Sequence, residues 1–299
     1  MKKLRNLAIF AVIGAFALTG CGQSGTPEAE SGAEEPTAAA PEYSVASDVD
    51  LKDSPTWEKA DSAGKIRIGV KYDQPGLGNK KAGSDAPEGF DVEIAKMIAA
   101  SLGFSADQIE WSEAQSANRE LFLKNGQVDL IVATYTINDE RKQQVDFAGP
   151  YYIAGQDLLV KADSDIAGPE DLAGKKVCSV DGSTPAKRIA DEYPDAELEQ
   201  LGGYSECVTK LESGETDAVT TDDAILRGYA KQYGDQFKVV GKPFSEEPYG
   251  VGLPKGDDAL RNAVNDALEA GAKDGTWKKA FEYTLGSSDG VTAPEVDRY

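Results

Sequence analysis

Histidine is absent from this chain of 299 residues, and cysteine occurs only three times. Without histidine, the protein cannot use imidazole acid–base chemistry, a Ser-His-Asp triad or a histidine-ligated metal. Three cysteines are too few for a zinc ribbon or an iron–sulfur cluster. The sequence therefore predicts neither a metal centre nor a cofactor.

Basic residues are also scarce, because 31 Lys and Arg stand against 52 Asp and Glu and the formal net charge is −21. A nucleic-acid binder needs a basic face that replaces the counterions of the phosphates. The excess of negative charge thus excludes nucleic acid as a partner. A mean hydropathy of −0.43 likewise excludes a protein with many membrane spans.

The apolar run near the start of the chain, Leu7 to Leu18, has 12 residues, fewer than the roughly 20 that a spanning helix needs. Basic residues precede it, and it ends in Leu18-Thr19-Gly20-Cys21, which matches the bacterial lipobox. We expect residues 1–21 to be a lipoprotein signal. Cys21 would then be diacylated and anchor the protein on the outer face of the cytoplasmic membrane. The alternative is an ordinary signal in which Cys21 is incidental.

Residues 22–56 are rich in Ala, Pro, Glu, Ser and Gly and contain almost no large apolar side chain. Such a segment cannot bury enough area to offset its chain entropy. We expect a flexible acidic tether here and, by the same test, a loose tail at residues 287–299.

Between the tether and the tail, strand and helix patterns alternate. Strands are expected at 66–70, 128–133, 158–160, 176–180, 217–220 and 250–253, and helices at 90–98, 186–192, 208–211, 224–233, 258–272 and 276–283. Repeated β-α-β units favour an α/β architecture with mostly parallel sheets. The length suggests two lobes, but periodicity does not say which segment joins which lobe.

Three segments resemble bacterial extracellular solute-binding proteins of family 3, which serve polar amino-acid ABC importers. They are Gly89 to Ala95, Val128 to Arg141, and Asp171 to Val177 followed by Gly182-Ser183-Thr184. The second is the most specific, although Asn138 stands where Thr is usual. Within the family, the chain is most similar to actinobacterial glutamate-binding lipoproteins.

The resemblance implies an α/β, two-lobed periplasmic-binding-protein fold of type II, with two mixed sheets joined by two hinge crossovers. Lobe 1 would comprise residues 57–153 and 248–286, and lobe 2 residues 158–243. The crossovers would fall near residues 152–157 and 246–249. The lobes of such proteins close on their ligand by hinge motion.

The resemblance also implies the ligand contacts. Arg141 would clamp the α-carboxylate, because a guanidinium can donate two parallel bonds to a carboxylate. Asp222 would pair with the α-ammonium. The other expected contacts come from both lobes: Thr134 and Thr136 at the α-carboxylate and ammonium, Ser183 and Thr184 at a helix N-terminus, Lys71, Arg119 and Ser116 at the distal carboxylate, and Tyr204.

Simpler roles exist for several of these residues. Asp222 could be no more than a helix N-cap, a role that neighbouring Asp223 could fill equally well. Ser183 and Thr184 could be a plain capping pair. On the simpler reading, three side chains are ordinary solvated surface charges, namely Lys71, Arg119 and Arg141.

The expected function is an extracytoplasmic, lipid-anchored substrate-binding protein that captures glutamate or aspartate and delivers it to an ABC permease with its ATPase subunits. We expect a monomer that is not an enzyme. The alternatives are a binder of glutamine or of polar amino acids in general, a ligand-sensing protein, and a dehydratase-type enzyme on the same fold. The related glutamate-binding proteins carry both Cys178 and Cys207, which implies a disulfide rather than two buried thiols.

Overall fold

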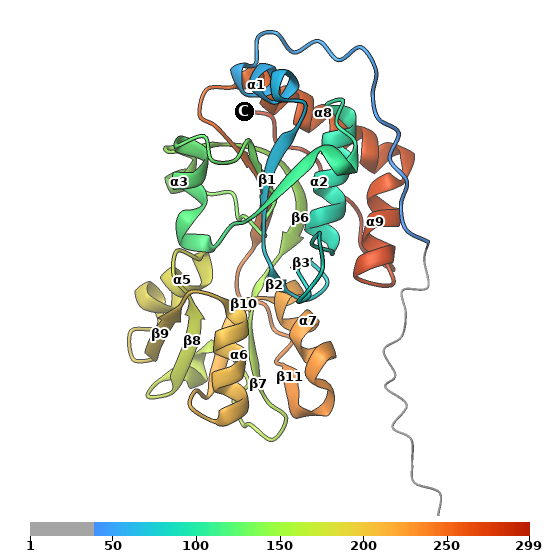
Figure 1. Cartoon of the computed structure of the whole chain (residues 1–299). Coiled ribbons are helices and arrows are strands. Elements are labelled where there is room, and N and C mark those ends of the chain that lie inside the picture. Colours follow the sequence, from blue (N-terminus) through green and yellow to red (C-terminus); the bar gives the residue numbers. More distant parts are fainter. Residues whose placement is uncertain (1–38) are drawn as a thin grey trace, which may run out of the picture. The chain divides into compact units, whose positions relative to one another are not determined.

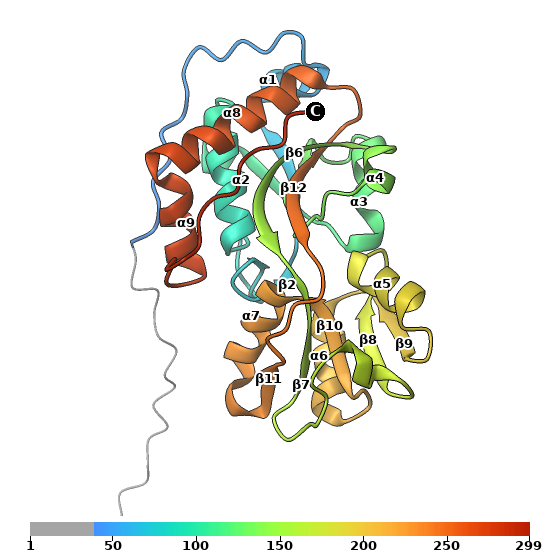
Figure 2. The same cartoon turned by 180° about the vertical axis from the view of Figure 1, so that it is seen from behind.

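The computed structural model describes residues 39–299, in which helices and strands form two lobes with one five-stranded sheet each, and lobe 1 also holds the small β2–β3 sheet (Figures 1 and 2). Lobe 1 contains α1 (Pro55–Ala63), β1 (Ile66–Val70), β2 (Asp73–Gln74), β3 (Gly78–Asn79), α2 (Phe90–Ser101), β4 (Ile109–Glu113), α3 (Arg119–Lys124), β5 (Leu130–Ile131), α4 (Asp139–Lys142), β6 (Asp146–Ala154), β12 (Glu247–Leu253), α8 (Asp258–Asp274) and α9 (Thr276–Thr284). Lobe 2 contains β7 (Gln156–Lys161), β8 (Lys176–Val180), α5 (Thr184–Glu192), β9 (Glu197–Leu201), α6 (Tyr204–Ser213), β10 (Ala218–Asp222), α7 (Asp223–Tyr233) and β11 (Phe237–Val239).

The sheet of lobe 1 has the strand order β4-β1-β5-β12-β6, and that of lobe 2 has the order β11-β7-β10-β8-β9. Strands β1, β4 and β5 pair in parallel, as do β8, β9 and β10. β12 runs antiparallel to β5 and β6, and β7 runs antiparallel to β10 and β11. The expected α/β class and the mixed character of both sheets are confirmed.

Two connections join the sheets. Gly155 alone separates β6 from β7, and Figure 2 shows the two strands continuing into one another beside β12. The second connection is residues 240–246. It overlaps the expected 246–249 at residue 246 and ends there, because Glu247 already pairs with Ala154 in the ladder of β12 and β6.

Helices α1, α4, α5 and α8 begin at a residue whose side chain caps them. The side chain of Ser183 accepts a hydrogen bond from the backbone N–H of Ala186 at the start of α5. Asp257 does the same for Leu260 at the start of α8. Helix α2 is buried almost all round, because it lies between the sheet of lobe 1 and helices α8 and α9. Each cap satisfies an N–H group that the helix itself leaves without a partner.

In lobe 2, Cys178 of β8 and Cys207 of α6 form a disulfide, with their Cα atoms 5.5 Å apart. The implied pairing is confirmed. The bond closes a loop of 29 positions and joins an interior strand of the sheet to helix α6, which packs against it. In the chain-entropy view, a loop of that size stabilises the lobe by roughly 3–4 kcal/mol.

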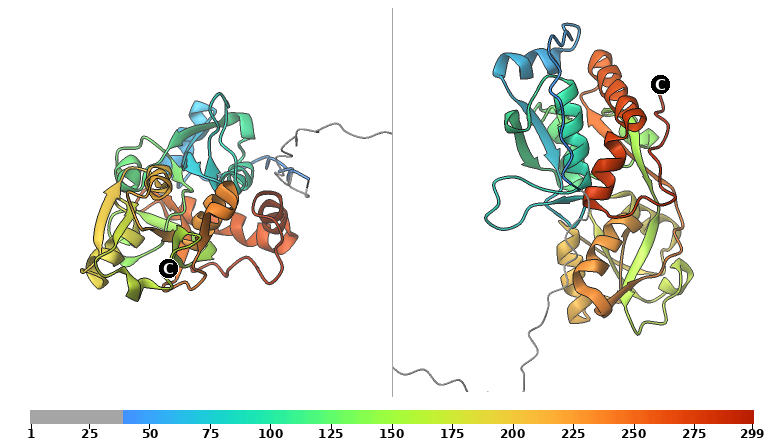
Figure 3. Two further views of the ribbon diagram at one scale, coloured as in Figure 1. Left: turned by 90° about the horizontal axis from the view of Figure 1, so that it is seen from below. Right: turned by 90° about the vertical axis from the view of Figure 1, so that its right-hand side faces the viewer.

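The segment before α1 is less free than we expected of a tether. Among residues 39–54, the N–H of Ala46 donates to the carbonyl of Ala100, and the hydroxyl of Tyr43 donates to Glu93. This segment therefore runs beside α2 (Figure 3). Tyr43, Val49 and Leu51 supply the apolar contacts with the core. The signal peptide, Cys21 and the first part of the tether lie outside the described residues.

The expectation of a loose tail at residues 287–299 is wrong. The segment has no helix or strand, but the N–H of Asp297 donates to Gly149. The hydroxyl of Tyr299 accepts from the N–H of Phe147 at 2.9 Å. The cations of Lys142 and Arg261 lie 3.9 and 4.6 Å from the centre of the Tyr299 ring. Long-range contacts of this kind cannot be seen in the composition of a short polar segment.

Because Tyr299 receives these contacts, Tyr299→Ala is expected to lower the free energy of unfolding by about 1–2 kcal/mol. Tyr299→Phe keeps the ring and should lose a smaller part of that. Denaturant unfolding of the three proteins gives both values. Identical midpoints for Tyr299→Ala and the unaltered protein would show that the tail adds no stability.

Candidate functional site

The candidate site lies at the carboxyl ends of the parallel strands of both sheets. Lys71 follows β1, Ser116 follows β4, and residues 132–136 follow β5. In lobe 2, Ser183 follows β8 and Asp222 ends β10. Open α/β sheets commonly bind their ligands at this edge. The topology therefore gathers the predicted residues at the facing edges of the two lobes.

Three cationic side chains of lobe 1 are buried together. Lys71, Arg119 and Arg141 expose 3%, 2% and 6% of their surface. The guanidinium carbons of Arg119 and Arg141 lie 4.2 and 5.0 Å from the centre of the Tyr135 ring. Both positive groups therefore contact the same aromatic ring. The reading of these three side chains as ordinary solvated surface charges is therefore wrong.

The cations have few anionic partners among the described residues. Lys71 Nζ donates to Ser116 Oγ at 2.8 Å. Arg119 donates to the carbonyls of Ser116, Ala133 and Thr134. Neither forms an ion pair within 4.0 Å in this part of the chain, whereas Arg141 Nε lies 3.4 Å from Glu120. This cluster of side chains carries an excess of buried positive charge.

The same crowding lowers the affinity of these groups for protons. Burial lowers the pKa of Lys71 to about 7, and the nearby charge of Arg119 adds to the effect. Burial also lowers the pKa of Arg141 to about 10, again with a contribution from Arg119. A bound anion would oppose both shifts, because it favours the protonated cation.

Thr134 has an unusual backbone, with a φ of 44° in the left-handed region. Its N–H donates to Asp91 Oδ2 at 2.9 Å, and its hydroxyl donates to Gln74 Oε1 at 3.2 Å. Asp91 also accepts from the hydroxyl of Tyr151 at 2.8 Å. A strained non-glycine residue that is held from several sides is typical of functional sites.

Asp222 of lobe 2 is the buried carboxyl group of the site. Its Oδ2 accepts from the hydroxyl of Tyr249 at 2.7 Å. Its Oδ1 is buried and has no hydrogen-bond partner in the described chain. Burial raises the pKa of Asp222 to about 8, and the charge of Glu247 adds to the shift. A buried oxygen of this kind destabilises the folded protein unless it accepts a hydrogen bond.

Helix capping does not explain Asp222. It occupies the N-cap position of α7, but its side chain makes no capping hydrogen bond. Neighbouring Asp223 accepts from the N–H groups of Ala224 and Gly155 instead. Ser183 does cap α5, as the simpler reading had it. Tyr204 lies beside Asp222, and burial together with that charge raises the pKa of its phenol to about 12.

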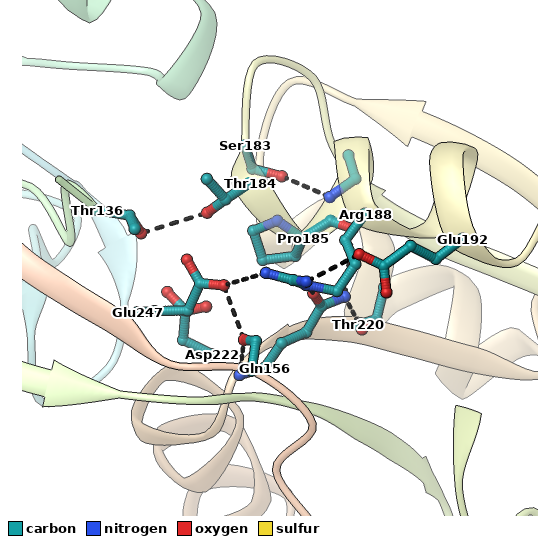
Figure 4. Close-up of polar contacts among 12 residues, drawn as sticks. Thr136, Gln156, Ser183, Thr184, Pro185, Arg188, Glu192, Thr220, Asp222 and Glu247 are labelled. Atoms are coloured by element: carbon teal, nitrogen blue, oxygen red, sulfur yellow. Dashed lines mark hydrogen bonds and ion pairs between the residues drawn. The ribbon is translucent and has the colours of Figure 1, made fainter. Parts of the chain in front are cut away.

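The two lobes touch directly at this site. Thr136 Oγ1 and Thr184 Oγ1 are 3.2 Å apart (Figure 4), and Arg141 Nη2 donates to the carbonyl of Gly182 at 3.0 Å. Gly182 has a φ of 73°, and a Cβ there would lie 2.6 Å from Ala117 Cα. Only glycine permits this approach.

A second interlobe contact lies at the β2–β3 hairpin of lobe 1. The hydroxyl of Tyr229 donates to the carbonyl of Asp73, and the N–H of Ser205 donates to the Asp73 carboxylate at 3.2 Å. A Cβ on Gly228 would lie 2.2 Å from the carbonyl oxygen of Pro75. The two lobes therefore contact each other at both places, with the site between them.

All ten predicted ligand residues therefore lie in this one region, although their contacts with a ligand remain predictions. No motif had predicted a role for Gln74, Asp91, Tyr135 or Tyr249. The Nε2 of Gln74 is buried and has no partner among the described residues. Asp91 was detectable as an acid in the first turn of a helix rich in apolar residues, and Tyr135 as the aromatic residue between Thr134 and Thr136.

This arrangement can hold a small solute that carries negative charge toward lobe 1 and positive charge toward lobe 2. The model of bacterial extracellular solute-binding proteins, family 3, matches residues 66–287 of the chain. The chain belongs to this family.

Relatives of this family 3 protein include the glutamate-binding protein GluB of Corynebacterium glutamicum, which is 43% identical over 78% of the chain and 82% of the relative. The glutamine-binding protein GlnH of Bacillus subtilis is 38% identical over 94% of the chain and 97% of the relative. A solved structure of an ancestral arginine-binding protein bound to glutamine has a TM-score of 0.70 and 38% identity, and the match covers 75% of this chain and 99% of that one. The expected family and two-lobed fold are confirmed.

Asp222→Asn is expected to stabilise the unliganded protein, and by more at pH 8 than at pH 5. An unfolded Asp loses its proton near pH 4, whereas the folded Asp222 keeps it up to about pH 8. The penalty is therefore absent below pH 4 and grows as the pH rises through this window.

Denaturant unfolding at the two pH values measures this gain. Asp107→Asn is the control, because Asp107 is exposed and its hydrogen bond from Ser105 lowers its pKa. An equal gain at both pH values, or a loss at pH 8, would mean that Asp222 is not a strained buried acid.

Proposed function

We propose that the protein binds glutamate or aspartate outside the cytoplasm and delivers it to an ABC permease. The observation that carries this proposal is the charge pattern between the lobes. Lys71 and Arg119 are buried without carboxylate partners among the described residues, and Asp222 presents a buried oxygen without a donor. An acidic amino acid has two carboxylates and one ammonium, and therefore matches both needs.

The expected contacts follow from the position of each group. Arg141 and Thr136 would hold the α-carboxylate at the interlobe contact with Gly182 and Thr184. The α-ammonium would supply the missing donor to Asp222. Lys71, Arg119 and Ser116 would bind the distal carboxylate. Pairing each charge matters because an unpaired buried charge costs several kcal/mol.

Glutamine is the second candidate, because relatives named for glutamine match the chain at 38–39% identity. A glutamine side chain carries no charge and would leave Lys71 and Arg119 facing a neutral amide. The two buried cations favour an acidic ligand over glutamine.

A dehydratase-type enzyme is the third candidate, because Lys71, Asp91 and Asp222 have pKa values shifted towards neutrality. Such shifts are frequent at catalytic sites. A binding site explains them as well, because the ligand charges would offset burial of Lys71 and Asp222. An enzyme that acts on glutamate would convert it during incubation, whereas a binding protein returns it chemically unchanged.

Arg119→Met and Arg141→Met separate the two carboxylate sites. Arg119→Met should weaken glutamate by roughly 2–5 kcal/mol and glutamine by much less, because only glutamate has a distal charge. Arg141→Met should weaken both ligands together. Titration calorimetry on protein refolded without ligand measures all four affinities.

Lys124→Met is the matched control on the same helix, because Lys124 is exposed and its Nζ donates to Gln144 Oε1 at 2.6 Å. If Arg119→Met lowers glutamate and glutamine binding by the same factor, Arg119 is a structural residue. The preference for an acidic ligand would then be left with Lys71 alone.

Lipid attachment at Cys21 remains part of the proposal, since residues 1–38 lie outside the described chain. None of the helices in residues 39–299 is long and apolar enough to cross a membrane. Cys21→Ser should move the protein from the detergent phase to the aqueous phase without changing ligand affinity, because the described fold begins well after Cys21. Retention of the variant in the detergent phase would refute the anchor.

A further inference from the structure

Arg188 of α5 connects its helix to both crossovers between the lobes. Its Nε donates to Gln156 Oε1 at 3.1 Å, and its Nη2 lies 3.3 Å from Glu247 Oε1 (Figure 4). Gln156 is the first residue after one crossover, and Glu247 is the first residue of the strand after the other. One guanidinium therefore contacts both points at which the lobes are joined.

The crossovers are also tied to each other. Ser245 Oγ accepts from the N–H of Gln156 at 3.0 Å and donates to Glu247 Oε1 at 2.7 Å. The side-chain amide of Gln156 donates through Nε2 to the carbonyl of Pro185, in the first turn of α5, at 3.2 Å. Helix α5 begins at Thr184, which meets Thr136 of lobe 1. The ligand-facing end of α5 is thus held against the hinge from two sides.

Glu247 brings a second negative charge close to Asp222. Glu247 exposes only 1% of its surface, and Arg188 is the cation within 4.0 Å of it in the described chain. Glu247 and Tyr249 lie two positions apart on β12, so they point to the same side of the strand. Since the hydroxyl of Tyr249 donates to Asp222, that side faces Asp222 (Figure 4).

The other groups that act on Asp222 come from three further elements. Asp223 of α7 adds negative charge, and Arg141 of α4 adds positive charge. Tyr204 of α6 lies beside it as a neutral phenol. Among these, Glu247 is the strongest charge that raises the pKa of Asp222. Its own charge is balanced from the side of the hinge by Arg188.

We propose that Arg188 and Glu247 are positioning residues that control ligand binding from the hinge without touching the ligand. Arg188 holds α5 against both crossovers in the closed form. The negative charge of Glu247 controls how readily Asp222 loses the proton that it must give up to pair with the ammonium of the ligand. This inference rests on the proposed function, because it assigns the ammonium to Asp222.

Arg188→Met removes the connection to the hinge. The affinity for every α-amino acid that binds should fall about tenfold, mainly through faster dissociation, while the ratio between ligands stays constant. Lys187→Met is the matched control, because Lys187 is the neighbouring residue of α5 and pairs with exposed Asp191 at 3.1 Å. Stopped-flow dissociation rates and calorimetry measure these effects.

Glu247→Gln removes a negative charge near Asp222, whereas Arg188→Met removes a positive charge. Removing Glu247 lowers the pKa of Asp222, whereas removing Arg188 raises it. As the pH rises from 6.5 to 9, the affinity of Arg188→Met relative to the unaltered protein should therefore increase. The relative affinity of Glu247→Gln should decrease over the same range. The titrations of Lys71, Asp91 and the free ligand are common to all three proteins and cancel in these ratios.

The double variant Arg188→Met/Glu247→Gln replaces Arg188→Met if the unpaired Glu247 prevents folding, and it should dissociate as fast while its relative affinity no longer increases with pH. Dissociation rates equal to those of Lys187→Met, or relative affinities that change with pH in the same direction for both single variants, would overturn the inference. A protein that binds no α-amino acid would overturn the proposed function and this inference with it. If the unaltered protein binds α-amino acids and both single variants bind them with the same affinity and rates, the inference alone is overturned.

Discussion

Burial of charge between the two lobes is the constraint on which the rest of the structure depends. Lys71 and Arg119 are removed from water without a carboxylate at ion-pair distance in the described chain, and Asp222 presents an oxygen that no donor reaches. An arrangement of this kind is costly by itself and becomes favourable when a solute supplies the complementary charges. Recognition and closure are then one physical event, because both depend on bringing the lobes together around paired charges.

The fold serves this constraint through its topology. Parallel strands of both sheets deliver their carboxyl ends to the same region, and one antiparallel strand pair, β6 and β12, carries the chain to and from lobe 2. The net charge of −21 would repel an acidic solute at long range. Physiological salt screens that field beyond about 8 Å, so the buried cations of lobe 1 dominate at the site.

The sequence was sufficient where a feature depends on local pattern or on a specific motif. The apolar spacing of Phe90, Ile94 and Met97 predicted α2, and the paired cysteines of the related proteins predicted the disulfide. The segment around Arg141 pointed to a residue that is buried at the lobe contact.

The sequence was insufficient where a feature depends on contacts between distant residues. Strand β6 was not predicted, because Gly149 and Pro150 within it are typical of turns. Helix α1 was missed, since its residues are mostly polar and it depends on the Ser54 cap and on Trp57. The expected strand at 128–133 is buried throughout, yet only Leu130 and Ile131 join the ladder. The contacts of Tyr299 and the hinge contacts of Arg188 exist only in the folded chain.

A crystal structure of the protein with glutamate bound is the most direct test of the central claim, which is that the ligand pairs the buried charges of the two lobes. We expect the α-carboxylate at Arg141, the ammonium within hydrogen-bond distance of Asp222 Oδ1, and the distal carboxylate at Lys71 and Arg119. A ligand bound with its ammonium away from Asp222, or with Lys71 and Arg119 both out of reach of its carboxylates, would contradict the account.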